Sequence, residues 1–98
     1  MKKRENAMDN FADILRDILF GKRGETIRDE VEGYTIDTVE ISTIGYETAI
    51  CKGDGDWVVV ARYKDRERAV KGHKIWMMAC AAKPTKVFSI QTGDYEIL

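Results

Sequence analysis

Side chains that could carry out chemistry are few in this sequence. The single histidine, His73, and the two cysteines, Cys51 and Cys80, are its only imidazole and thiol groups. His73 falls on the apolar side of a predicted helix, where a buried histidine bonded to a backbone carbonyl is commoner than a general base. Neither thiol has a partnered base, and no Ser-x-x-Lys, Gly-x-Ser-x-Gly or His-Glu-x-x-His pattern is present. We therefore predict no catalytic residues and a protein that is not an enzyme.

Little in the sequence indicates a metal or a cofactor, and we expect none. Residues 53–56, Gly-Asp-Gly-Asp, alternate glycine with acid as calcium loops do, but further spaced oxygens and a closing glutamate are missing. A hairpin turn explains them better, and the two acids would repel phosphate. One histidine and two scattered thiols are too few ligands for zinc. We expect Cys51 and Cys80 to be free and buried, with a disulfide as the alternative.

Positive charge gathers in the second half of the chain, although the net charge is −1. Residues 34–56 hold five acids against one base (−4), and residues 57–86 hold eight bases against two acids (+6). Cations in the first turn of a helix oppose its dipole, so this segment could be an anion site where backbone N–H groups and guanidinium forks converge. The alternatives are a solvated face with ion pairs such as Glu67–Lys71, or pairing of the two charged halves in an oligomer. The candidate anion-binding residues are Arg62, Lys64, Arg66, Arg68, Lys71 and His73.

Other partners and compartments are predicted from what the chain lacks. No helix-turn-helix signature is present, and an acidic hairpin adjoins the basic segment, which argues against duplex nucleic acid. No apolar run approaches the roughly 20 residues that span a bilayer. The first residues, MKKRENAMDNF, are basic but lack the apolar stretch of a signal peptide. We expect a cytoplasmic protein that does not enter a membrane.

The 98 residues are expected to form one small domain in four parts. Residues 1–8 should be a frayed tail, 9–21 a helix, 22–33 a charged linker and 34–98 an α+β core. The helix carries an apolar stripe at positions i, i+3, i+4, i+7 and i+8, which must bury on this chain's sheet or on a neighbouring copy. The residues of this stripe, and candidates for a partner interface, are Phe11, Ile14, Leu15, Ile18 and Leu19.

The order of elements predicts the fold class, an α+β domain with an antiparallel sheet of four to five strands. One long helix, from Arg66 to about Ala82 and capped by Asp65, should lie across that sheet. The alternation slips at Thr38–Val39, which predicts a bulge, and the apolar run at 57–61 predicts a central strand. The predicted strands are Tyr34–Ile41, Tyr46–Cys51, Trp57–Tyr63, Lys86–Thr92 and Tyr95–Leu98.

The middle third of the chain resembles a group of small uncharacterised proteins encoded by bacteriophages and prophages. The shared pattern is Ser-Thr near a glycine, an aromatic-Glu-Thr strand, an Arg-Tyr pair, and a helix with alanine three residues before Gly-His. The family usually has more residues between the glycine and the aromatic, so one loop is shorter here. No activity is established for the group. The matching positions are Ser42, Thr43, Gly45, Tyr46, Glu47, Thr48, Arg62, Tyr63, Ala69, Gly72 and His73.

The resemblance implies a phage-type accessory protein in the cytoplasm of a bacterial host. We expect it to self-associate and to bind a host protein or an anionic small molecule, as a counter-defence inhibitor or a nucleotide-sequestering protein does. The alternative is a structural or assembly component of the virion, and a small enzyme is the third hypothesis. Gly72 inside a helix costs about 1 kcal/mol relative to alanine, so we expect a close backbone approach there. Arg62 or Tyr63 on the adjacent strand could meet His73 at that point.

Overall fold

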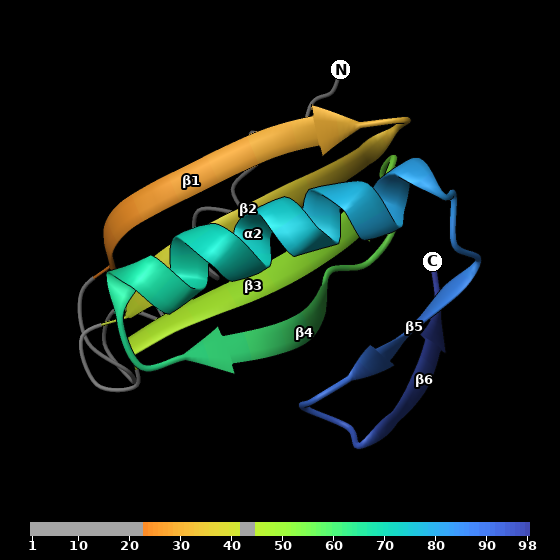
Figure 1. The fold of residues 1–98 in the computed structure, drawn as a ribbon. Helices are drawn as coiled ribbons and strands as arrows, with labels where there is room; N and C mark the ends of the chain where they lie inside the picture. The colour runs from red at the N-terminus through yellow and green to blue at the C-terminus, as the bar shows by residue number, and fades with distance from the viewer. Residues whose placement is uncertain (1–22, 42–44) are drawn as a thin grey trace.

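The computed structural model describes residues 23–41 and 45–98 (Figure 1). The elements are β1 (Arg23–Val31), β2 (Tyr34–Ile41), β3 (Gly45–Lys52), β4 (Val58–Tyr63), α2 (Arg66–Ala81), β5 (Lys86–Ser89) and β6 (Asp94–Ile97). The first four strands form an antiparallel sheet in the order β1-β2-β3-β4, and α2 lies across one face of it. Strands β5 and β6 form a second, two-stranded sheet beside β4. The predicted α+β class and the helix across an antiparallel sheet are confirmed.

The linker predicted over residues 22–33 is wrong, because Arg23–Val31 form the edge strand β1. Its side chains alternate, so that Asp29 is half-buried on the side of α2 and Arg28 is exposed on the other side. An edge strand can carry many charges, because only one of its faces is covered and exposed charges discourage further strand pairing. A two-residue turn, Glu32-Gly33, with φ values of 53° and 85°, joins β1 to β2.

Strand β2 is confirmed, but the bulge predicted at Thr38–Val39 is wrong, since its pairing with β3 is unbroken. Ile36 and Thr38 face α2, whereas Val39 and Ile41 lie on the opposite face. The break in the apolar alternation of β2 therefore has another cause. The apolar side chains of the strand face α2 up to Ile36 and face the opposite side from Val39 onward. A polar residue, Thr38, takes the next position beneath the helix.

Strand β4 lies at the edge of the four-stranded sheet, and its predicted central position is wrong. Val58–Val60 are buried nevertheless, because the β5–β6 hairpin continues beside them and the Ile90 N–H donates to the Val59 carbonyl at 3.0 Å. A register shift opposite Thr48 accommodates Val60 as an extra residue. The last two strands thus make a separate sheet instead of extending the main one.

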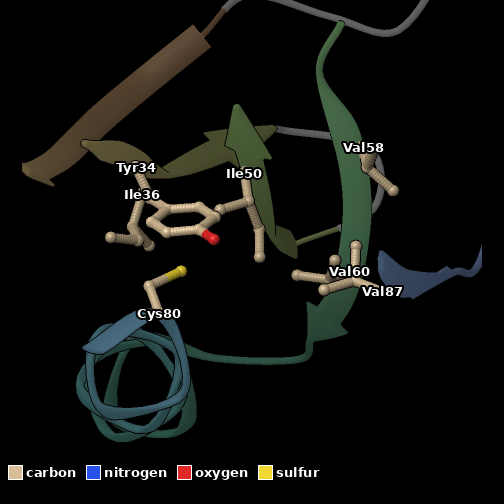
Figure 2. Close-up of a cluster of buried hydrophobic side chains, with 7 residues drawn as sticks. All are labelled: Tyr34, Ile36, Ile50, Val58, Val60, Cys80 and Val87. Carbon is tan, nitrogen blue, oxygen red and sulfur yellow. The ribbon is translucent and has the colours of Figure 1, made fainter. Parts of the chain in front are cut away.

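Helix α2 begins where predicted and ends one residue earlier, at Ala81. The Asp65 carboxylate accepts a hydrogen bond from the Arg68 N–H at 2.9 Å, which confirms it as the N-cap. Figure 2 shows the Cys80 thiol of α2 directed toward the sheet, where it meets the main apolar cluster. That cluster consists of Tyr34, Ile36, Ile50, Val58, Val60, Cys80 and Val87.

The predicted tail and helix, residues 1–8 and 9–21, lie outside the described residues, as does the whole apolar stripe. In the described ranges, no helix has the length and apolar character that crossing a membrane requires.

Candidate functional site

His73 projects from α2 into the interface with the sheet and is only 2% exposed. Its Nδ1 lies 2.7 Å from the Thr38 hydroxyl on β2, and its Nε2 lies 2.8 Å from the Asp29 carboxylate on β1. The prediction that His73 is buried is confirmed. Its partners, however, are two side chains from neighbouring strands, not the backbone carbonyl that we expected.

The hydrogen bonds continue across the sheet from Thr38. The hydroxyls of Thr38 and Thr48, directly opposite each other on β2 and β3, lie 2.6 Å apart. The Thr48 hydroxyl in turn donates to the Tyr63 phenol oxygen on β4 at 3.1 Å. Burial raises the pKa of Tyr63, so the phenol keeps its proton at neutral pH. We call Asp29, His73, Thr38, Thr48 and Tyr63 the His73 chain.

Asp29, His73 and Thr38 have the group types of a carboxylate–imidazole–hydroxyl triad, so catalysis has to be considered. A nucleophile must reach its substrate, but Thr38 is 0% exposed and its oxygen already contacts Thr48. Asp29 is the solvent-facing end, with 45% of its side chain exposed. The geometry suits a polar cross-link between the helix and three strands better than an acyl-transfer site.

The guanidinium groups of the predicted anion site each hold a carboxylate of this chain. Arg66 forms a fork with Glu25, with Nε and Nη2 each 2.9 Å from a carboxylate oxygen. This contact lowers the pKa of Glu25 and raises that of Arg66. Arg68 pairs with its neighbour Asp65. The guanidinium N–H groups that were predicted to bind a phosphate therefore already donate to carboxylates of this chain.

The six candidate residues are also not brought together on one surface. Arg62 pairs with Glu47 at 2.9 Å on the face of the sheet opposite α2, whereas His73 is buried beneath the helix. Lys71 lies 3.5 Å from Glu67, as the solvated-face alternative predicted. Lys64 is the one candidate without an ion pair to any described residue.

Sequence reasoning missed an exposed apolar surface on the β5–β6 hairpin. Phe88 and Tyr95 are direct cross-strand partners with ring centroids 5.4 Å apart in an edge-to-face arrangement. The Lys86 ammonium lies 5.1 Å from the centre of the Tyr95 ring, and Ile97 opposite Lys86 is 81% exposed. The signal in the sequence is the alternation of these residues with Val87 and Ser89, which are buried. We call Lys86, Phe88, Tyr95 and Ile97 the hairpin face.

Cys51 and Cys80 are free and buried, as predicted. They lie on opposite sides of the sheet, since Cys80 projects from α2 and Cys51 pairs with outward-facing Thr35. Among residues 23–41 and 45–98, no three His, Cys, Asp or Glu side chains are grouped so that they could hold a metal ion.

Comparison with known proteins finds no matching family model, no matching curated protein and no matching solved structure.

Proposed function

We propose that this chain is a small non-enzymatic accessory protein of phage or prophage origin that self-associates and engages a host protein through the hairpin face. The observation that carries the proposal is the exposure of Phe88, Tyr95 and Ile97, at 45%, 60% and 81%, on one side of a short hairpin. Clustered exposed aromatic and aliphatic side chains are typical of protein-binding surfaces.

The hairpin face has the composition of an interface centre. Two aromatic rings already fix each other's orientation, so little side-chain entropy is lost when a partner covers them. Lys86 lies over a ring with its stem along the apolar surface, where it can pair with a carboxylate at the rim. A protein partner therefore explains this surface better than a small anion does.

The burial of Thr38 and His73 supports a role other than catalysis, because the one triad-like arrangement in the described residues is closed at its hydroxyl end. The ion pairs of the basic segment favour a protein partner over an anionic small molecule. A nucleotide would have to displace Glu25 from Arg66 before it could use that guanidinium. The resemblance of the middle third of the chain to phage proteins supports the proposed origin and the host cytoplasm as the place of action.

The test is the concentration dependence of the molar mass, measured by size-exclusion chromatography with light scattering. The wild-type protein should associate, and Phe88→Ser/Tyr95→Ser should be monomeric with unchanged thermal stability. Ile75→Ser/Met78→Ser is the matched control, because these residues are as exposed, at 58% and 67%, but lie on α2. A monomeric wild-type protein at high concentration would remove self-association from the proposal.

A component of the virion is the second candidate, because a neighbouring subunit in a particle would cover the hairpin face in the same way. Mass spectrometry of purified particles separates the two, since an accessory protein is absent from them. The amphipathic helix expected over residues 9–21 stays a prediction, because these residues lie outside the described ones.

A further inference from the structure

The side of α2 that faces away from the sheet carries two exposed apolar residues, Ile75 and Met78, which are 58% and 67% exposed. They share this side with Lys71 and Lys74, because the four positions follow the helical spacing i, i+3, i+4 and i+7. Cys80, which α2 buries against the sheet, lies on the opposite side of the helix. In Figure 1, α2 lies in front of the sheet, so its exposed side faces the viewer. We call Lys71, Lys74, Ile75 and Met78 the α2 ridge.

The folding of this chain does not account for the apolar pair of the α2 ridge. Trp76 and Met77, which lie between the pair in the sequence, pack against the main apolar cluster, whereas Ile75 and Met78 are directed to solvent. Isoleucine is also a poorer helix former than lysine or alanine, since its β-branched side chain loses rotational freedom in a helix. An apolar centre with a charged rim is instead the composition of a protein-binding surface.

The charged rim of the α2 ridge is positive. Lys74 is exposed and forms no ion pair with any residue in 23–41 or 45–98. Lys71 lies 3.5 Å from Glu67, and the two side chains are 73% and 79% exposed. So exposed a pair contributes little to stability, and a carboxylate of a partner can replace Glu67 beside Lys71. The complement of this rim is therefore an acidic surface.

We propose that the α2 ridge binds an acidic amphipathic helix of another protein. The apolar side chains of that helix cover Ile75 and Met78, and its carboxylates pair with Lys71 and Lys74. The ridge is a convex row about 10 Å long, and such a row fits between the side-chain rows of a second helix. An extended peptide is bound in a groove or at a sheet edge instead. Because the ridge and the hairpin face lie on different elements, this site does not depend on the proposed function.

A second copy of this chain suits the α2 ridge less well than an acidic partner. A copy in parallel orientation sets lysine against lysine. A copy in antiparallel orientation brings Lys83, just beyond the end of its helix, toward Lys71. Like charges therefore meet in either orientation. An anionic membrane is also a poorer match, because helices that lie in a membrane bury a wide apolar face, whereas the ridge has two apolar residues.

An NMR titration of the full chain with two designed peptides tests the proposal. Both peptides are helical and carry leucine at i, i+3, i+4 and i+7, with glutamates beside this row in one peptide and lysines in the other. The acidic peptide should shift the amide signals of residues 71–78 most and bind about 3- to 30-fold more tightly than the basic one, as two exposed ion pairs allow. Equal affinities, no binding of the acidic peptide, or shifts confined to the hairpin would each overturn the proposal.

Substitutions on the α2 ridge separate the two parts of the site. Lys71→Glu/Lys74→Glu should reverse the preference, so that the basic peptide binds more tightly. Ile75→Ser/Met78→Ser should remove the binding of both peptides. All four side chains are exposed, so the variants should keep the far-UV circular dichroism spectrum of the wild-type protein. A preference for the acidic peptide that survives the charge reversal contradicts the proposal.

The matched control for charge is Lys52→Glu/Lys64→Glu, which changes the net charge equally at two exposed lysines outside the ridge. It should keep the preference for the acidic peptide, and a reversed preference would reveal a general charge effect. Phe88→Ser/Tyr95→Ser should also bind the acidic peptide like the wild-type protein, so a failure of the hairpin face stays distinguishable. Vesicles of phosphatidylglycerol and phosphatidylcholine should not bind the chain. Vesicle binding that Ile75→Ser/Met78→Ser removes would assign the ridge to a membrane and refute a protein partner.

Discussion

Gly72 of α2 lies directly against the phenol ring of Tyr63 on β4. A Cβ placed on Gly72 would collide with the Cε1, Cζ and hydroxyl oxygen of that ring. The close approach expected from a glycine inside a helix is therefore present, and Tyr63 is the residue that requires it. Because the Thr48 hydroxyl holds the phenol by a hydrogen bond, the ring cannot swing away freely. Helix α2 thus packs against the sheet through the contact of Gly72 with Tyr63, the last residue of the His73 chain.

Replacing this glycine should destabilise the protein, although alanine is the better helix former. We expect Gly72→Ala to lower the free energy of unfolding by about 1–3 kcal/mol, because overpacking outweighs the gain of about 1 kcal/mol in helix propensity. Urea unfolding followed by far-UV circular dichroism measures the change.

The control for this prediction removes the ring. In a Tyr63→Leu background, Gly72→Ala should be neutral or stabilising by up to about 1 kcal/mol. Equal destabilisation in both backgrounds would mean that the collision with Tyr63 is not the cause.

Removing the central hydroxyl of the His73 chain should also be costly. Thr38→Val keeps the shape of a side chain that is 0% exposed, but it leaves Nδ1 of His73 and the Thr48 hydroxyl without their shared partner. We expect a loss of about 1–3 kcal/mol in unfolding free energy, measured by urea unfolding. Thr35→Val on the same strand, facing the other way, should change it by less than about 0.5 kcal/mol.

Coupling between the two threonines tests whether the chain acts as a unit. Once Thr38→Val has broken it, adding Thr48→Val should cost less than it does in the wild-type protein. Strict additivity would argue that the hydrogen bonds are independent.

The elements that could be predicted from the sequence are those defined by neighbouring residues, such as a helix cap, a helix-ending proline or a glycine turn. Asp65 and Pro84 bracket α2, and the glycines between 53 and 55 separate two β-rich runs. Strand β1 was missed because most of its residues are charged or polar. Its side chains alternate between exposed and half-buried positions, and an edge strand tolerates such a composition. The Glu32-Gly33 turn was its one local signal.

The candidate site was less predictable, because its contacts depend on register. Asp29 meets His73 only because β1 pairs with β2, in a segment that composition marked as a linker. Thr38 and Thr48 become partners only when they lie opposite each other. The hairpin face was missed because strands β5 and β6 have only four residues each. The sequence of so short a strand does not show which of its two faces is buried in the protein.

The hydroxyl of Tyr34 should matter more than that of Tyr46. Tyr34 donates to the Pro84 carbonyl at 2.6 Å, linking β2 to the segment after α2, whereas Tyr46 reaches Glu25 at 3.5 Å, the limit of a hydrogen bond. We expect Tyr34→Phe to cost about 1 kcal/mol of unfolding free energy and Tyr46→Phe less than half of that. Thermal or urea unfolding of the two variants compares them, and the reverse order would contradict this account.

Acid should weaken the protein through the Glu25–Arg66 contact. The pKa of Glu25 in the folded state lies below its ordinary value of 4.5, because Arg66 favours the carboxylate. A carboxyl with a lowered folded-state pKa contributes stability that is present above its unfolded-state pKa and is lost as the pH falls through the folded-state value. Asp65 shifts in the same direction through its bond to the Arg68 N–H, so the unfolding free energy should fall as the pH drops from about 5 to 3.

Glu25→Gln separates this contribution from general acid unfolding. The variant should be less stable than the wild-type protein at pH 6, and the difference should shrink toward pH 3, where Glu25 itself becomes protonated. Because the pair is exposed to solvent, 1 M NaCl should reduce the difference at pH 6 as well. Glu67→Gln, which removes the surface pair with Lys71, is the matched control and should leave the pH profile nearly unchanged. Identical pH profiles for wild type and Glu25→Gln would show that this contact does not hold β1 to α2.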